Sequence, residues 1–131
     1  GGVALVRTKK TLEKIATDNL DETTGIQIVN KAIESPLRTI VENAGGEGSV
    51  VINKVLEGNK NFGYDAKSET YVDMLEAGII DPKKVTRVAL ENAASVAGMI
   101  LTTECALIDI KEDAPAGAGM PPMGGGMPGM M

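Results

Sequence analysis

Histidine and tryptophan are absent from this 131-residue chain, and cysteine occurs only at Cys105. Without histidine, the side chain most often used for proton transfer at neutral pH is missing, and one lone cysteine does not build a structural zinc site. A single cysteine forms no internal disulfide, which favours a reducing compartment. Composition therefore excludes His-based acid/base catalysis and a structural zinc site, and we expect Cys105 to be a small buried hydrophobe.

Aromatic residues are limited to Phe62, Tyr64 and Tyr71, too few for a surface on which nucleic-acid bases stack. The net charge of −5, with acids and bases interspersed, provides no basic stripe for phosphates. No apolar run reaches about 18 residues, and no charged-then-apolar leader is present. The sequence thus predicts no nucleic-acid partner and no membrane segment, and it favours the cytoplasm, with an organelle matrix as the alternative.

The chain has enough apolar residues, 43%, for the core of one small domain. Residues 113–131 are dominated by Gly, Met, Pro and Ala and are expected to be disordered, because they bury too little apolar surface to offset the entropy of ordering. We therefore divide the chain into a folded unit, residues 1–112, and a tail, residues 113–131. The first residue is a glycine, so we expect a segment of a longer protein.

Apolar spacing predicts a mainly α-helical, multi-helix bundle. Helices are expected over residues 3–17, 22–34, 35–44 and 49–58, with one or two helical turns over 69–77 and a long helix after Asp81 and Pro82. Ser35, Ser49 and Asp81 are the expected N-caps, and Gly45 ends the third helix. On the second helix, Ile26, Val29 and Ile33 are expected to form the buried stripe. The long last helix is rich in small residues, which predicts the centre of the bundle.

Two short extended segments, 62–65 and 79–80, are expected to form a small β-ribbon. Residues 105–110 are β-prone and have no evident partner in the chain, so they predict a C-terminal strand that pairs with a neighbouring subunit. The alternative is pairing within the same subunit.

Asp65 and Asp81 end these two extended segments, an arrangement that suits a nucleoside. A carboxylate at Asp81 fits ribose hydroxyls, and Asp65 with its neighbouring backbone fits a base edge. Local rules alone favour simpler roles, because Asp81 precedes a proline as an N-cap does and Asp65 follows a Gly-Tyr pair as a turn residue does. Gly1 and Gly2 are a weak phosphate signal, since they lack the spacing and the lysine of a P-loop.

Several motifs follow one another along the chain: GGVALVR from Gly1, FGYDA from Phe62, MLEAGIIDPKKVTRVAL from Met74, ENAASVAG from Glu91 and TTE from Thr102, before a Gly/Met-rich tail. Together they resemble the carboxyl-terminal equatorial segment of the group I, GroEL-type chaperonins, from Gly1 to about Asp113. Each motif is weak alone, and their number and order make the resemblance specific.

The resemblance implies a subunit of an ATP-dependent ring chaperone that encapsulates non-native polypeptides. The implied partners are identical subunits, a GroES-type co-chaperonin and unfolded chains. The implied ATP-binding residues are Gly1, Asp65, Ala66, Lys67, Ile79 and Asp81. Gly1 would allow close approach of the nucleotide, residues 65–67 would lie at the adenine, Ile79 would pack on the base or sugar, and Asp81 would accept the ribose hydroxyls.

The resemblance also implies that the Mg²⁺ ligands, the phosphate cradle and the residue that orients water lie outside this chain. The intact protein would then be an ATPase, whereas this segment alone would be inactive. Asp65 stands where the family commonly has Asn, and Lys67 where it commonly has Ala. Two other functions stay open: a stand-alone helical interaction module or degenerate fragment without ATPase activity, and a small nucleotide-binding regulator.

Overall fold

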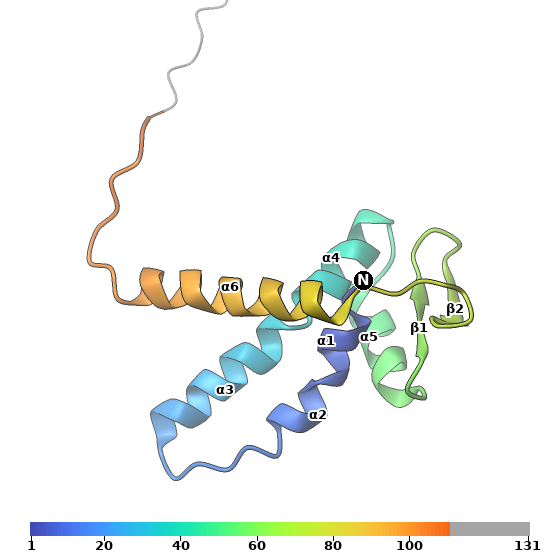
Figure 1. Ribbon diagram of the computed structural model, residues 1–131, viewed down its shortest axis with the longest axis horizontal. Helices are drawn as coiled ribbons and strands as arrows, with labels where there is room; N and C mark the ends of the chain where they lie inside the picture. Colours follow the sequence, from blue (N-terminus) through green and yellow to red (C-terminus); the bar gives the residue numbers. More distant parts are fainter. Residues whose placement is uncertain (111–131) are drawn as a thin grey trace, which may run out of the picture.

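The computed structural model describes residues 1–110, so the predicted tail lies outside the described residues, as do the last two residues of the predicted folded unit. The prediction of a mainly helical fold with a small β-ribbon is confirmed (Figure 1). The helices are α1 (Val3–Arg7), α2 (Lys9–Leu12), α3 (Leu20–Ala32), α4 (Ser35–Asn43), α5 (Gly48–Glu57) and α6 (Lys83–Leu101). The strands are β1 (Phe62–Asp65) and β2 (Thr70–Asp73).

The core lies where α1, α4 and α5 meet. Its fully buried side chains come from all three helices: Val6, Leu37, Val41, Val51, Ile52 and Val55. On α4 and α5 these residues recur at the four-residue spacing that puts side chains on one face of a helix. The short helix α1 contributes only Val6, which is completely buried, so its position depends on packing and not on its own helical stability.

A glycine allows α1 to approach α4 closely. Gly2 has φ of +84°, and a Cβ atom at this position would lie 2.6 Å from the backbone nitrogen of Leu37. No other residue type combines this backbone conformation with this contact. The amino terminus is therefore fixed against the first turn of α4.

The β-ribbon differs from the prediction in its second strand. Phe62–Asp65 pairs antiparallel with Thr70–Asp73, not with Ile79 and Ile80, and the helical turns expected over 69–77 are wrong. The reason is aromatic packing: the Tyr71 ring lies 5.4 Å from the Phe62 ring and 5.1 Å from the Tyr64 ring. β-Branched and aromatic residues in cross-strand contact favour strand over helix here.

The N-caps of α4, α5 and α6 lie one or two residues from the predicted Ser35, Ser49 and Asp81, so these three predictions are wrong. Glu34 is helical (φ −75°, ψ −27°), so α3 leads into α4 and Ser35 lies inside the helix. Glu47 is extended and its carboxylate accepts a hydrogen bond from the Ser49 backbone, so Glu47, not Ser49, caps α5. Pro82 is the N-cap of α6, which leaves the Asp81 side chain without a capping role.

Other helix boundaries depend on hydrogen bonds between a side chain and the nearby backbone. The Thr8 hydroxyl donates to the Leu5 carbonyl, and the single helix expected over residues 3–17 is divided there into α1 and α2. Asn19 accepts hydrogen bonds from the next turn and starts α3 two residues earlier than predicted. The predicted end of α4 is confirmed, with Gly45 at φ of +82°.

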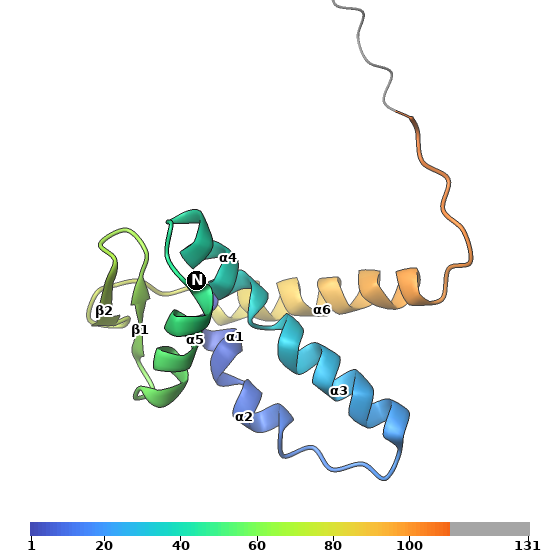
Figure 2. The same ribbon diagram turned by 180° about the vertical axis from the view of Figure 1, so that it is seen from behind.

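The last helix is not central within the described residues. None of its residues is buried, and the same holds for the extended segment that follows it (Figures 1 and 2). Residues 105–110 form no strand within this chain, so the predicted pairing with a neighbouring subunit stays a prediction. Cys105 is exposed, contrary to the prediction that it is buried. No strand of the described residues lies beside this segment to pair with its backbone. Ile33, the residue that follows α3, is buried, but Val29 within the helix is 43% exposed, so the predicted stripe is covered only at its end.

Replacing Gly2 by alanine should destabilise the protein by about 2–4 kcal/mol, because the new Cβ meets the Leu37 backbone and the left-handed conformation is strained. Gly25→Ala is the matched control. Gly25 lies in α3 with nothing within 4 Å of an added Cβ, so alanine should stabilise by roughly 0.5–1 kcal/mol. Urea unfolding followed by circular dichroism measures both changes. Equal stabilities for the two variants would contradict the close approach.

Candidate functional site

A groove of about 640 Å³ lies between α1, the loop before β1 and the start of α6. Residues from these three regions line it, among them Gly1, Arg7, Lys60, Ile79, Asp81 and Leu90. The amino terminus and the beginning of α6 lie side by side in both ribbon views, although they are about 80 positions apart in the sequence (Figures 1 and 2). The groove therefore joins two distant parts of the chain.

A tight turn brings the segment before α6 into the groove. The Asp73 carboxylate accepts hydrogen bonds from the backbone of Leu75 and Glu76, and Gly78 adopts φ of +68°. The Ile79 backbone then donates to the Met74 carbonyl at 2.9 Å. This turn reverses the chain after β2 and leads Ile79 and the following residues along the groove wall.

Three of the six predicted site residues line this groove: Gly1, Ile79 and Asp81. A Cβ on Gly1 would lie 3.9 Å from Oδ2 of Asp81 and 2.9 Å from Cδ1 of Ile40. Residue 1 is therefore a direct neighbour of the Asp81 carboxylate, and a side chain there would come into contact with it. Asp81 is exposed and its side chain accepts no helix-capping bond, so its oxygens remain accessible to a ligand.

The other three predicted residues, Asp65, Ala66 and Lys67, are not among the residues that line the groove. They lie in the turn of the β-ribbon, where the Asp65 carboxylate accepts hydrogen bonds from the Ser68 hydroxyl at 2.7 Å and the Lys67 backbone at 3.0 Å. These bonds, the Ser68 bond foremost, lower the pKa of Asp65 below its ordinary value. Asp65 is therefore a turn residue, as local rules favoured, and each of its two carboxylate oxygens accepts a hydrogen bond within the turn.

Sequence reasoning missed several residues of the groove, including Arg7, Lys60 and Thr86. Four of the lining residues are cationic, Arg7, Lys60, Lys83 and Arg87, and one, Asp81, is acidic. Arg87 also donates to Glu91 one turn further along α6, at 2.7 Å. Apolar walls with a positive rim suit a ligand that has a flat apolar part and an anionic part. The basic residues that follow the Asp-Pro motif, Lys83 and Arg87, were the available signal.

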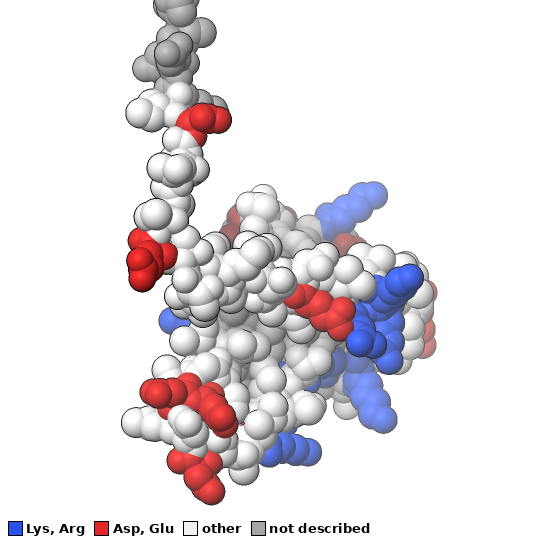
Figure 3. All heavy atoms as spheres, turned by 60° about the vertical axis from the view of Figure 1, so that its left-hand side comes forward, with Lys and Arg blue, Asp and Glu red and all other residues white. Residues whose placement is uncertain are grey.

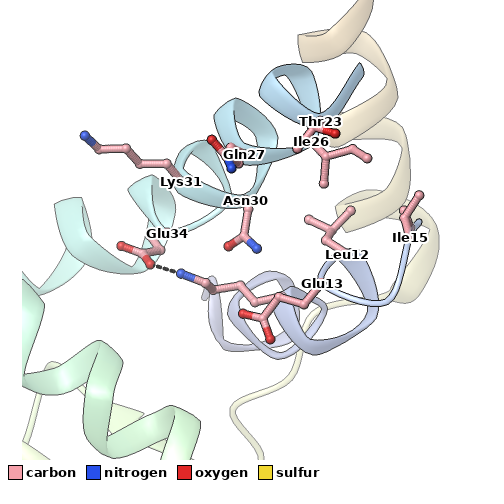
Figure 4. Close-up of a pocket in the computed structure, with 10 residues that line it drawn as sticks. Leu12, Glu13, Ile15, Thr23, Ile26, Gln27, Asn30, Lys31 and Glu34 are labelled. Atoms are coloured by element: carbon pink, nitrogen blue, oxygen red, sulfur yellow. Dashed lines mark hydrogen bonds and ion pairs between the residues drawn. The ribbon is translucent and has the colours of Figure 1, made fainter. Parts of the chain in front are cut away.

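A second cavity, of about 580 Å³, lies between α2 and α3 and contains none of the predicted site residues (Figure 4). Leu12, Ile15 and Ile26 form its apolar side. At its other end Lys9 pairs with Glu34, which also accepts a hydrogen bond from Arg38 at 3.1 Å. This ion pair ties α2 to the junction of α3 and α4.

Charged groups do not cluster as metal ligands do. In residues 1–110, no three Asp, Glu or Cys side chains come together in a way that could hold a metal ion.

None of the described helices is both long and apolar enough to cross a membrane. On the face shown in Figure 3, acidic side chains gather at the lower edge and along the extended end of the chain, most basic side chains lie toward the right, and much of the surface between them is uncharged.

The helices and the β-ribbon of this chain match known proteins in both fold and sequence. The fold is similar to the open-state monomer of a group II chaperonin from Methanococcoides burtonii, with a TM-score of 0.68 and 23% sequence identity. The similarity covers 79% of this chain but only 27% of that one. The model of the TCP-1/cpn60 chaperonin family matches residues 1–111. The chain belongs to this family.

Acidification should weaken the ion pair at the second cavity. The hydrogen bond from Lys9, with a further contribution from Arg38, lowers the pKa of Glu34 below its ordinary value of 4.5. Its stabilising contribution is therefore complete above pH 4.5 and is lost as the pH falls through the lowered pKa. Glu34→Gln should cost about 0.5–1 kcal/mol at neutral pH and nothing once both forms are neutral.

Thermal unfolding of wild type and Glu34→Gln across this pH range measures the difference. The control is Glu57→Gln, an exposed glutamate with no ion pair among residues 1–110. A stability difference between wild type and Glu34→Gln that does not change with pH would show that the pair contributes nothing.

Proposed function

We propose that this chain forms part of the nucleotide-binding equatorial domain of an ATP-dependent, ring-forming chaperonin that encapsulates non-native polypeptides. One observation carries the proposal: Gly1, Ile79 and Asp81 line the same groove, although Gly1 is about 80 positions away from the other two in the sequence. The resemblance assigns these three residues to one nucleotide. Family membership supports a chaperone role for the protein of which this chain is a part.

The groove offers each residue a distinct task toward ADP or ATP. Asp81 is the acid among the lining residues and accepts hydrogen bonds from ribose hydroxyls. Ile79 provides an apolar wall for the base or sugar, and Gly1 leaves the space that a Cβ would fill. Residues 65–67 would take part through the turn of the β-ribbon, with the backbone of Ala66 and Lys67 facing the adenine edge.

Hydrolysis would need groups beyond this chain. Mg²⁺ bound to the phosphates neutralises the charge that develops on the transferred group. The cationic rim of the groove suits the phosphates themselves, whereas the single lining acid is too little for a magnesium site. The intact protein would therefore act as the ATPase, with its Mg²⁺ ligands supplied by other parts of the subunit.

The motifs favour the group I branch, and with it a GroES-type co-chaperonin and a cytoplasmic or organelle-matrix location. The similarity to a group II chaperonin, at 23% identity, concerns the fold alone. Ring assembly would use the segment 105–110, whose apolar side chains are fully open: Leu107 is 100% exposed and Ile108 is 85% exposed. An extended segment with free backbone groups and apolar side chains suits pairing with a strand of the next subunit.

Asp81→Ala in the full-length subunit should weaken ADP binding about 10–100-fold, because the ribose hydroxyls lose a charged acceptor. Isothermal titration calorimetry measures the affinity. The control is Asp18→Ala, which removes another exposed carboxylate that lies outside the groove and should leave the affinity unchanged. Wild-type affinity in the Asp81→Ala protein, with an unchanged melting temperature, would show that the nucleotide does not bind here.

Replacing both Leu107 and Ile108 by glutamate should break the ring, because charges cannot be buried in a strand between subunits. Multi-angle light scattering of the intact protein should show a large loss of mass. Ile28→Glu, at another exposed apolar position in α3, is the control and should leave the ring intact. A ring of unchanged mass in the double variant would rule out the role of this segment between subunits.

A further inference from the structure

The guanidinium of Arg7 makes an unusual set of contacts. Arg7 ends α1, and its side chain reaches the loop that joins α5 to β1. There it donates to three backbone carbonyls: Gly58 at 3.2 Å, Phe62 at 2.6 Å, and Asn59. One rigid fork of N–H donors thus spans five consecutive residues of the loop.

The positive charge of Arg7 has no acidic partner among the described residues. In the described part of the chain Arg7 forms no ion pair, and its Nε atom is buried without a hydrogen-bond partner. Burial lowers the pKa of the guanidinium. The side chain as a whole is only partly buried, and all three of its hydrogen bonds go to backbone carbonyls of one loop. The fork is therefore better explained by the loop geometry that it imposes than by stability.

The loop held by Arg7 is a wall of the groove. Lys60 and Asn61 lie within the loop and line the groove directly. The loop is also tightly closed, because the Phe62 backbone donates to the Asn59 carbonyl at 3.0 Å. A Cβ at Gly58 would lie 2.2 Å from the Phe62 ring. The loop has little room to change its shape while Arg7 holds its carbonyls.

Two backbone hydrogen bonds extend this restraint to the predicted nucleotide residues. The Met74 backbone donates to the Asn61 carbonyl at 2.9 Å, and the Ile79 backbone donates to the Met74 carbonyl at 2.9 Å. Displacing the loop would therefore displace Met74 and then Ile79. The other end of α1 carries Gly1, beside Asp81. Helix α1 thus connects both sides of the groove within seven residues.

We propose that Arg7 is a positioning residue: its guanidinium fixes the loop 58–62 and, through Asn61 and Met74, sets the position of Ile79 relative to Gly1 and Asp81. The effect on nucleotide affinity rests on the proposed function, whereas the restraint on the loop does not. Arg7 itself need not touch the nucleotide. Its role is to keep the groove at the width that the ligand requires.

The test compares full-length wild type, Arg7→Met and Arg7→Lys by amide hydrogen exchange. Arg7→Met keeps the length of the side chain without donors, and Arg7→Lys keeps the charge but cannot span three carbonyls. Exchange at the amides of Phe62, Met74 and Ile79 should rise roughly tenfold in Arg7→Met and by a smaller factor in Arg7→Lys. Exchange at Val51 and Val55, in the core of α5, should stay as in wild type.

The same proteins are then titrated with ADP. Affinity should fall about three- to tenfold in Arg7→Met and less in Arg7→Lys. Arg38→Lys is the control, because Arg38 bonds to Glu34 and Ser49 away from the groove, and it should alter neither the loop exchange nor the affinity.

Three results would overturn the proposal: loop amides that exchange as in wild type, exchange that rises equally in α5, or a loosened loop with unchanged ADP affinity. The first shows that Arg7 does not hold the loop, the second that it only stabilises the whole fold, and the third that the loop does not position the ligand. If Arg7→Met does not fold, Arg7→Lys decides the same questions. Failure of wild type to bind ADP would instead refute the proposed function, and the exchange data would still decide whether Arg7 restrains the loop.

Discussion

The contact between Gly2 and the backbone of Leu37 determines how the rest of the structure is arranged. It holds α1 against α4 closely enough for Val6 to be completely buried with Leu37 and Val41. A helix of five residues is not stable by itself, so its orientation comes from this contact. With α1 fixed, Gly1 lies beside Asp81 at one end and Arg7 reaches the loop before β1 at the other. The groove exists because both ends of α1 are held.

The two carboxylates singled out in the sequence have different local environments. Asp65 accepts two hydrogen bonds within the turn of the β-ribbon, which satisfy its oxygens and lower its pKa. Asp81 precedes a proline that takes the capping position, so its side chain is left to face the groove. A carboxylate without a structural partner is the better candidate for binding a ligand. This difference favours Asp81 as the residue on which the proposed nucleotide binding would depend most.

The carboxyl-terminal part of the described chain has the opposite character, with much apolar surface and no cover. Along α6, Val96, Met99 and Ile100 are each at least half exposed, and Leu107 and Ile108 beyond the helix are almost fully exposed. Contiguous apolar surface of this kind marks sites of contact with other protein. The chain spans 27% of the group II chaperonin that it resembles in fold, so such contacts with the remainder of a subunit or with its neighbours fit the proposed ring.

The sequence by itself determined the helical class, the first strand of the ribbon, the glycine end of α4 and the motifs that identify the family, because these depend on local spacing and on residue order. It also indicated Gly1, Ile79 and Asp81. Only the tertiary structure decided that Thr70–Asp73 is the second strand, since Tyr71 packs on Phe62 across the ribbon. It likewise showed that Asp81 does not cap α6 and that Arg7 holds the loop before β1. These features depend on contacts between residues far apart in sequence and on backbone conformation at single positions, and neither leaves a periodic pattern in the chain.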